Sequence, residues 1–332
     1  MDDTDLIACA PSYACALADA ARAAGNDVTT GLGLAAAFGR RLPQPGEGNT
    51  AARWACLVIA AEQDLTAARI LEAHSDALAI LHEAGEPTPD GTWGVFAAEA
   101  PHVTLEANET TLTGTKPWCS LGGALDHALV TAQTACGRRL YAVDLRHQTV
   151  TADPPATWVA RGMANLPSGP VHFAGTPARP VGAPGWYLDR PGFAWGGIGV
   201  AACWLGGARA LYATLRRKLA ERQDDLAALH VGIVDVALHG AQAALRLAAD
   251  DVDGGRAVGA QGALLALRVR SVVADAVETV LRQVGHALGP APLAFDDVHA
   301  RRVADLELYV RQHHGERDLA ALGRAVLDGA QR

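Results

Sequence analysis

The sequence predicts an α+β chain with three regions: an N-terminal helical region, a middle antiparallel β-barrel or sandwich, and a C-terminal four-helix bundle. Two observations predict this order. The hydrophobic periodicity changes from helical to strand-like near Thr92 and returns to helical near Ala194. Half of the 332 residues are hydrophobic, so the chain can bury a core that serves two or three packed subdomains. The expected regions are residues 1–88, 89–190 and 191–332.

The first region is expected to be helical up to about residue 85. Its longest apolar run begins after a cap-like pair, Asn49 and Thr50, and ends at Gly85. A turn-rich connection, GRRLPQPGEGNT, precedes this run and separates it from the helical residues nearer the N-terminus.

Short apolar stretches separated by turn residues fill the region from about Thr92 to Pro180. They recur at a spacing near ten residues, with Gly, Pro and Asn between them, which is typical of an antiparallel barrel or sandwich. The proline-rich segment GTPARPVGAPGWYLDRPGF closes this region.

The helical period then continues almost to the C-terminus. Four amphipathic segments follow one another, and that succession predicts a helical bundle. Their apolar stripes are Trp204, Ala208, Leu211 and Leu215; Leu226, Leu229, Ile233 and Val236; Val269, Val273, Ala276, Val280 and Val284; and Val303, Leu306, Val310 and His313.

Charge and cysteine usage exclude several classes of partner. Lys plus Arg total 28 and Asp plus Glu total 36, which gives a formal net charge of −8 with no basic stripe. An acidic chain of this kind argues against nucleic acid as a partner. The six cysteines stand alone, without CxxC or paired Cys/His spacing, so no metal site is expected. Unpaired thiols also indicate that the protein works in the reducing cytoplasm.

No membrane association is expected from the sequence. The N-terminus opens with acidic residues, whereas a signal peptide opens with basic ones. The apolar stretch from Pro191 to Ala208 has the composition of a membrane span, but it is dense in glycine, and we expect a buried helix of a soluble protein.

Two short motifs have simpler explanations than the sites they suggest. GIGVAA, from Gly197 to Ala202, matches a dinucleotide-binding pattern, but no β-branched strand precedes it, so close helix packing explains it better. In RQHHGERDLAALG, His314 and Asp318 have the i, i+4 spacing of metal ligands, yet no third ligand is near, so a solvated helix face is expected.

The segment GTKPWCSLGG, from Gly114 to Gly123, interrupts a strand with a proline, an indole, a thiol and a hydroxyl. Together with the helix–strand–helix order, it resembles the acyl-CoA dehydrogenase superfamily, whose middle domain carries G-x-K-x-W followed by a small or hydroxyl residue. RQVGHALG resembles the family's Gln-x-x-Gly-Gly-x-Gly segment, with His286 in place of a glycine. VADLELYVRQHH resembles its closing segment through Asp305 and Tyr309. The resemblance extends from about residue 45 to the C-terminus.

This resemblance implies bound FAD. In the family the Trp packs on the isoalloxazine and the following hydroxyl bonds near its N5 atom, roles that Trp118 and Ser120 would take. The earlier flavin strand would correspond to WGVFAAEAP, although its usual Gly-Ser turn is missing. The family's R-x-x-F-G segment, which holds FAD across the dimer, is replaced, with Arg217 or Arg222 as substitutes. The implied cofactor-binding residues are Phe96, Ala97, Ala98, Trp118, Cys119, Ser120, Gln283, Gly285 and Gly289.

Both positions that usually hold the family's catalytic carboxylate lack one here. The alignment puts His313 at one and Trp195 at the other. Three explanations stay open. In the first, the catalytic base is His313 or Glu316, reached by a shift in the register of the alignment. A His has an unperturbed pKa that suits proton abstraction. Alternatively the chain resembles the family's flavin-dependent monooxygenases, or it is a catalytically inactive flavoprotein or partner subunit.

The resemblance therefore implies a cytoplasmic flavin oxidoreductase that performs α,β-oxidation of an acyl-CoA or another acyl thioester, acting on a CH–CH group. Its electron acceptor is not indicated. The family's assembly implies a homodimer or homotetramer.

Overall fold

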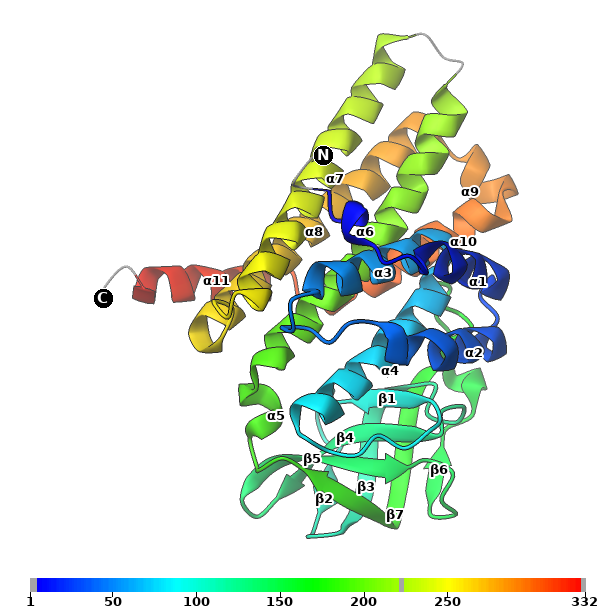
Figure 1. Ribbon diagram of the computed structural model, residues 1–332. Helices are drawn as coiled ribbons and strands as arrows, with labels where there is room; N and C mark the ends of the chain where they lie inside the picture. Colours follow the sequence, from blue (N-terminus) through cyan, green and yellow to red (C-terminus); the bar gives the residue numbers. More distant parts are fainter. Residues whose placement is uncertain (1–4, 221–223, 330–332) are drawn as a thin grey trace.

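The computed structural model describes residues 5–220 and 224–329, and it has helices at both ends of the chain around a strand region (Figure 1). The helices of the first region pack on the long C-terminal helices, and the sheet lies at one end of the molecule. This is the α+β order that the change of periodicity predicts.

The N-terminal region is helical as expected, but its long apolar run is two helices. Asp64 has extended backbone angles, and its side chain accepts a hydrogen bond from the backbone N–H of Ala67 at 2.9 Å, so it caps the second helix. The predicted cap Asn49 makes no such side-chain bond. The helices are α1 (Ala14–Ala24), α2 (Val28–Phe38), α3 (Thr50–Gln63) and α4 (Leu65–Glu83), with 3-10 turns η1 (Ile7–Cys9) and η2 (Gly39–Arg41).

The middle region forms one sheet that closes on itself. Its pairings run β4–β2–β3–β7–β5 and return to β4, which makes a five-stranded barrel, while β1 and β6 pair with β4 and β7. Most pairs are antiparallel as predicted, but β1 and β2 both run parallel to β4. The strands are β1 (Trp93–Phe96), β2 (Leu105–Ala107), β3 (Thr111–Ser120), β4 (His127–Thr134), β5 (Gly137–Asp144), β6 (Val150–Ala152) and β7 (Ser168–Val181), with η3 (Pro155–Thr157) before β7.

The C-terminal region contains three long helices and several shorter ones. The long helix α6 packs between α3 and α8, and α7 packs along α8. The terminal helix α11 contacts α8 and extends away from the body of the molecule (Figure 1). The helices are α5 (Trp186–Asp189), α6 (Pro191–Leu219), α7 (Asp225–Asp253), α8 (Gly259–Leu288), α9 (Ala291–Phe295), α10 (Asp297–Tyr309) and α11 (Glu316–Gly329), with η4 (Val310–Gln312) after α10.

Two of the four predicted stripes differ from the buried faces. In α7 the predicted Leu226, Leu229 and Val236 are exposed, because the helix buries a neighbouring face instead. In the fourth segment α10 ends at Tyr309, so His313 lies in a turn rather than on a helical stripe. The face that α7 buries consists of Ala227, Val234, Leu238, Ala241, Leu245, Ala248, Ala249 and Val252.

Two helices are long and apolar enough to cross a membrane by length and composition alone, α6 and α7. In α6 the most apolar window is 78% buried within the protein, as expected of a core helix, and GIGVAA lies inside it. The corresponding window of α7 is only 22% buried, so this helix carries an apolar face that no described residue covers. Within residues 5–220 and 224–329, no group of three metal-ligating side chains occurs.

Candidate functional site

Two adjoining cavities lie where α4, the sheet and the C-terminal helices meet. The sheet cavity has a volume of about 610 Å³, and the bundle cavity, between α4, α6 and α8, has about 750 Å³. Their linings share five residues, so they form one continuous space. The shared residues are Glu72, Asp76, Tyr187, Val200 and His314.

The sheet wall of this space contains four of the residues that the sequence implies for flavin binding: Ala97, Ala98, Trp118 and Ser120. The indole of Trp118 is 59% exposed, which is unusual for so large an apolar side chain. Its φ angle is +58°, a left-handed conformation that costs a non-glycine residue of the order of 1–2 kcal/mol. Strain of this kind gathers at ligand sites, and here it directs a flat ring into the cavity mouth.

The local sequence explains this conformation. The pairing of β3 with β7 shifts between Lys116 and Cys119, so a bulge containing Pro117 and Trp118 stands out from the ladder. Proline fits a bulge because it lacks the donor that a regular ladder needs. Beyond the bulge, the Ser120 hydroxyl is 2.8 Å from the hydroxyl of Ser168, and both line the cavity.

The alternate residues of the same strand point into the barrel. Nζ of Lys116 donates to Glu99 Oε1 and to Thr131 Oγ1, both at 2.9 Å, and burial lowers the pKa of this amine. Burial also raises the pKa of the Cys119 thiol to about 12. Cys119 is therefore on the core face of the strand, away from the sheet cavity. Phe96 is likewise a core residue behind the cavity wall.

A loop before β7 forms a further wall through Met163 and Leu166. The buried Asp305 of α10 accepts a hydrogen bond from the backbone N–H of Met163, which itself has a φ of +47°. Burial raises the pKa of the Asp305 carboxyl. The family-like Asp305 thus holds the loop in place and does not itself line either cavity.

A buried carboxylate, Glu72, lies at the junction of the two cavities. Arg69 donates to it from the preceding turn of α4, and the phenol of Tyr309 donates from α10 with an oxygen–oxygen distance of 3.3 Å. Burial raises the pKa of Glu72 despite Arg69, and the neighbouring carboxylate of Asp76 raises it further. A carboxylate with a raised pKa beside a cavity has the properties of a general base.

The sequence-predicted base residues lie beside the cavities. His313 is partly buried, with Nε2 3.1 Å from the Ser271 hydroxyl, and burial lowers its pKa. Glu316 is exposed in the first turn of α11. Neither residue contributes to the lining of the two cavities.

The neighbouring His314 does line both cavities. Its Nδ1 is 3.2 Å from Oδ1 of Asp318, and its backbone N–H donates to the same carboxylate. The i, i+4 spacing of these two residues therefore serves a side-chain contact at the start of α11.

The second set of predicted cofactor residues lies at the far end of the bundle. Gln283 and Gly285 are in the last turns of α8, and Gly289 ends it with a φ of +66°. Nδ1 of His230 on α7 is 2.7 Å from Oε1 of Gln283. These residues do not line the two cavities, so a single chain does not bring them to Trp118.

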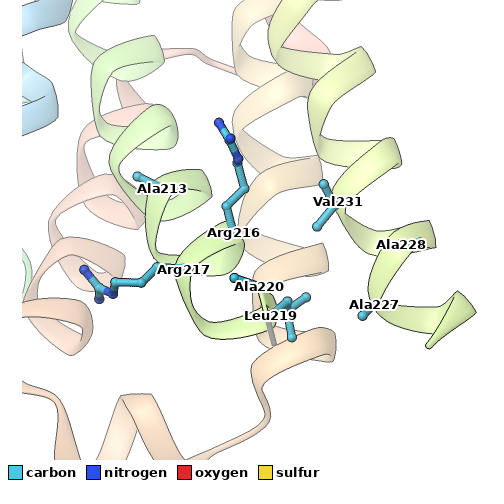
Figure 2. A pocket seen from close by; sticks show the side chains of 8 residues that line it. All are labelled: Ala213, Arg216, Arg217, Leu219, Ala220, Ala227, Ala228 and Val231. Carbon is cyan, nitrogen blue, oxygen red and sulfur yellow. The ribbon is translucent and has the colours of Figure 1, made fainter. Parts of the chain in front are cut away.

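Near that end is a shallow recess of about 640 Å³ between the C-terminal end of α6 and the first turns of α7 (Figure 2). Figure 2 shows the side chains of Arg216 and Arg217 leaving α6 in different directions beside small alanines. Arg217 is one of the two predicted substitutes for the family's dinucleotide-binding arginine. The other, Arg222, lies outside the described residues.

The sequence contained a signal for Glu72 and Asp76 that motif reasoning missed. The two carboxylates stand four residues apart, so they project from one face of α4. Polar residues on the buried face of a helix need a partner or a function, and this placement marks a site without any family motif.

The cavity wall fits a flat aromatic cofactor. The exposed indole of Trp118 offers a ring to stack on, Ala97 and Ala98 leave room beside the wall, and the hydroxyls of Ser120 and Ser168 offer hydrogen bonds to ring heteroatoms. This set matches the isoalloxazine of a flavin in shape and in donor chemistry.

No family model matches the chain, and no curated protein matches it in sequence. Solved structures match its fold. TdsC from Paenibacillus sp. A11-2, with FMN and indole, is 17% identical with a TM-score of 0.80, and 96% of each chain is covered. KijD3 with FMN and a dTDP-linked amino sugar is 17% identical with a TM-score of 0.79, over 99% of this chain and 97% of that one.

Butyryl-CoA dehydrogenase from Megasphaera elsdenii is 17% identical with a TM-score of 0.76, over 96% of this chain and 98% of that one. The chain therefore has the acyl-CoA dehydrogenase fold, and the resemblance drawn from the sequence is confirmed at this level.

Proposed function

We propose that the protein is a flavin-dependent oxidoreductase that oxidises the α,β carbon–carbon bond of an acyl thioester. The observation that carries the proposal is the buried Glu72, which has a raised pKa and lines the same cavity as Trp118 and Ser120. A base beside a flavin site can couple removal of the α-proton to departure of the β-hydride.

In this proposal the carboxylate of Glu72 accepts the α-proton of the substrate. Bound flavin supplies the acceptor for the β-hydride, and the product is the α,β-unsaturated thioester. Arg69 and Tyr309 hold the carboxylate through hydrogen bonds that favour its charged form. The sequence-based candidates His313 and Glu316 stand outside the cavity lining, which is why the base is assigned to Glu72.

We further propose that the flavin is FAD and that the protein forms a homodimer or homotetramer. The cavity wall at Trp118 lies near one end of the molecule, and the predicted residues Gln283, Gly285 and Gly289 lie near the other. An extended cofactor bound at Trp118 would therefore reach the second set only in another copy of the protein. The uncovered apolar side chains of α7, Leu226, Leu229 and Val236, offer a surface for such a copy.

A second candidate is oxygenation of a small molecule by a reduced flavin. One observation favours it: TdsC, described in another of its structures as a dibenzothiophene monooxygenase, shares this fold at a TM-score of 0.77. Neither usual base position here holds a carboxylate, and the indole of Trp195 at one of them donates to the carbonyl of Ala257 at 2.7 Å. A partner subunit without activity is the non-enzymatic alternative.

An anaerobic absorbance titration tests the proposal. The purified protein is titrated with a panel of acyl-CoA thioesters, and the flavin band is followed. Bleaching in proportion to added thioester supports the dehydrogenase. Bound flavin that no thioester reduces, together with rapid oxygen uptake by the chemically reduced protein, would favour the oxygenase. A colourless protein that does not take up added FAD or FMN would contradict both.

A further inference from the structure

The carboxylate of Asp76 lines both cavities at their junction. No hydrogen bond or ion pair involves this side chain in the part of the chain that the structure describes. The other carboxylates at this point are satisfied: Glu72 by Arg69 and Tyr309, and Asp318 by His314. Asp76 is thus the acceptor that the protein leaves for something else.

The cations around Asp76 are already used. Arg190 pairs with Glu83, with 2.6 Å between NH1 and Oε2. Arg270 donates to the carbonyls of Gly197 and Gln312 at 2.6 and 2.8 Å. Arg53, on α3, donates to the carbonyl of Pro43 and to the Ser75 hydroxyl. Arg53 interacts electrostatically with Asp76, but none of these guanidinium groups makes a hydrogen bond or ion pair with it among the described residues.

A second polar atom of the bundle cavity is also unmet. Nε of the buried Arg190, whose side chain is 2% exposed, has no acceptor among the described residues. Arg190 lines the same cavity, and an unsatisfied buried donor costs of the order of 1–3 kcal/mol. The cavity therefore offers both an acceptor and a donor to an occupant, in addition to apolar surface.

The bundle cavity also has an apolar part, beside charged side chains such as Arg270 and Asp318. Small residues of α6 and α8, such as Gly196, Gly197 and Ala263, line it together with Val200 and Phe193. A Cβ atom on Gly196 would lie 2.8 Å from Oδ1 of Asp76, so the missing side chain keeps the carboxylate uncovered. The cavity thus presents the carboxylate of Asp76, which has no hydrogen bond among the described residues, beside apolar surface.

We propose that the substrate carries a basic amino group on its apolar part, and that its ammonium pairs with Asp76 in the bundle cavity. This deepens the proposed function, since it assigns the substrate class of the same site, and it applies equally to an aminoacyl thioester and to an amine that is oxygenated. An ammonium is the ligand that both satisfies Asp76 and relieves its repulsion with Glu72 four residues away.

Calorimetric titration with three probes of equal length tests the proposal: hexylamine, hexanol and hexanoate at neutral pH. The expected result is that hexylamine binds about tenfold more tightly than hexanol, since hydrogen bonds to charged groups contribute more than neutral ones. Asp76→Asn should reduce hexylamine to the affinity of hexanol. Asp189→Asn, which removes an exposed carboxylate at the rim of the same cavity, should leave the preference unchanged.

Gly196→Ala gives a second variant, because its methyl group would cover Asp76 without changing any charge, and it too should abolish the amine preference. Equal affinities for the three probes, tightest binding of hexanoate, a preference that survives in Asp76→Asn, or no binding of hexylamine at millimolar concentration would each overturn the proposal.

Visible absorbance of the same samples separates this inference from the proposed function. An amine preference in a protein that binds no flavin would contradict the proposed function alone. Bleaching by unsubstituted acyl thioesters without any amine preference would contradict the amine assignment alone.

Discussion

The phenol of Tyr309 donates a hydrogen bond to Glu72 across 3.3 Å, and this contact joins the last residue of α10 to the middle of α4. Both side chains are buried. Burial raises the pKa of each group, and the hydrogen bond opposes this effect for Glu72, since it favours the charged carboxylate. The availability of the proposed base thus depends on a residue of another helix.

Replacing Glu72 by Gln should remove the proposed base while the flavin stays bound. We expect thioester-driven bleaching of the flavin to slow by about 10²–10⁴-fold, the usual contribution of general base catalysis. Stopped-flow absorbance under anaerobic conditions measures the rate. Glu316→Gln, on the exposed start of α11, is the matched control and should leave the rate unchanged. Slow bleaching in Glu316→Gln together with a normal rate in Glu72→Gln would contradict the assignment of Glu72 and favour Glu316, the base predicted from the sequence.

Tyr309→Phe should move the pH profile of bleaching rather than abolish it. Without the phenol, the charged form of Glu72 loses a donor, so its pKa rises further and the acid limb of the profile shifts to higher pH. The profile is measured by stopped-flow absorbance over a series of buffers. A uniform loss of rate without a shift would mean that Tyr309 has only a structural role.

Trp118→Ala should weaken flavin binding about tenfold, because the ring loses its stacking partner. Its effect on the free energy of unfolding should stay within about 0.5 kcal/mol, since the indole is mostly exposed. The buried Trp93 is the control, and Trp93→Ala should cost about 3–5 kcal/mol of stability. Equilibrium dialysis and urea unfolding measure the two effects. Unchanged flavin affinity in Trp118→Ala would contradict the placement of the flavin.

His74 should make the protein sensitive to acid. Its Nδ1 accepts the backbone N–H of Trp93 at 3.1 Å, and burial lowers its pKa from 6.5 to about 4. The unfolded chain therefore takes up this proton before the folded one. The stability linked to His74 is present above pH 6.5 and is lost as pH falls toward 4, about 3 kcal/mol in total.

Urea unfolding between pH 7 and 4 measures this loss. His74→Gln should flatten the dependence, whereas the exposed His239→Gln should not. An equally steep loss of stability in His74→Gln would show that other groups control the acid transition.

The sequence predicted the buried helix faces well where the apolar stripe given by the 3.6-residue period is also the face that the chain covers. The stripes at Trp204–Leu215 and Val269–Val284 are buried, because α6 is surrounded by other helices and α8 packs one apolar face within the chain. The stripe at Leu226, Leu229 and Val236 was wrong, because α7 is apolar on two faces and periodicity does not tell which of them the chain itself covers.

The candidate site was predicted in part, for a similar physical reason. The family resemblance of GTKPWCSLGG pointed to Trp118 and Ser120, and both line the sheet cavity. The same motif included Cys119, which the alternation of the strand turns into the core. The i, i+4 spacing of Glu72 and Asp76 places them on one face of α4, but it does not tell what that face meets, because the cavity arises from the packing of α4 between the sheet and α6.

The bulge in β3 also limits how the gene for this protein can change. Lys116 and Cys119 belong inside the barrel, and Trp118 and Ser120 belong outside it. Insertion or deletion of one codon here would exchange the two sets. The indole of Trp118 would then take the buried place of the Lys116 amine, and the Cys119 thiol would face the cavity. Substitutions can be absorbed singly, but a change of length cannot. Descendants of this sequence should therefore vary in residues between Gly114 and Ser120 while keeping their number.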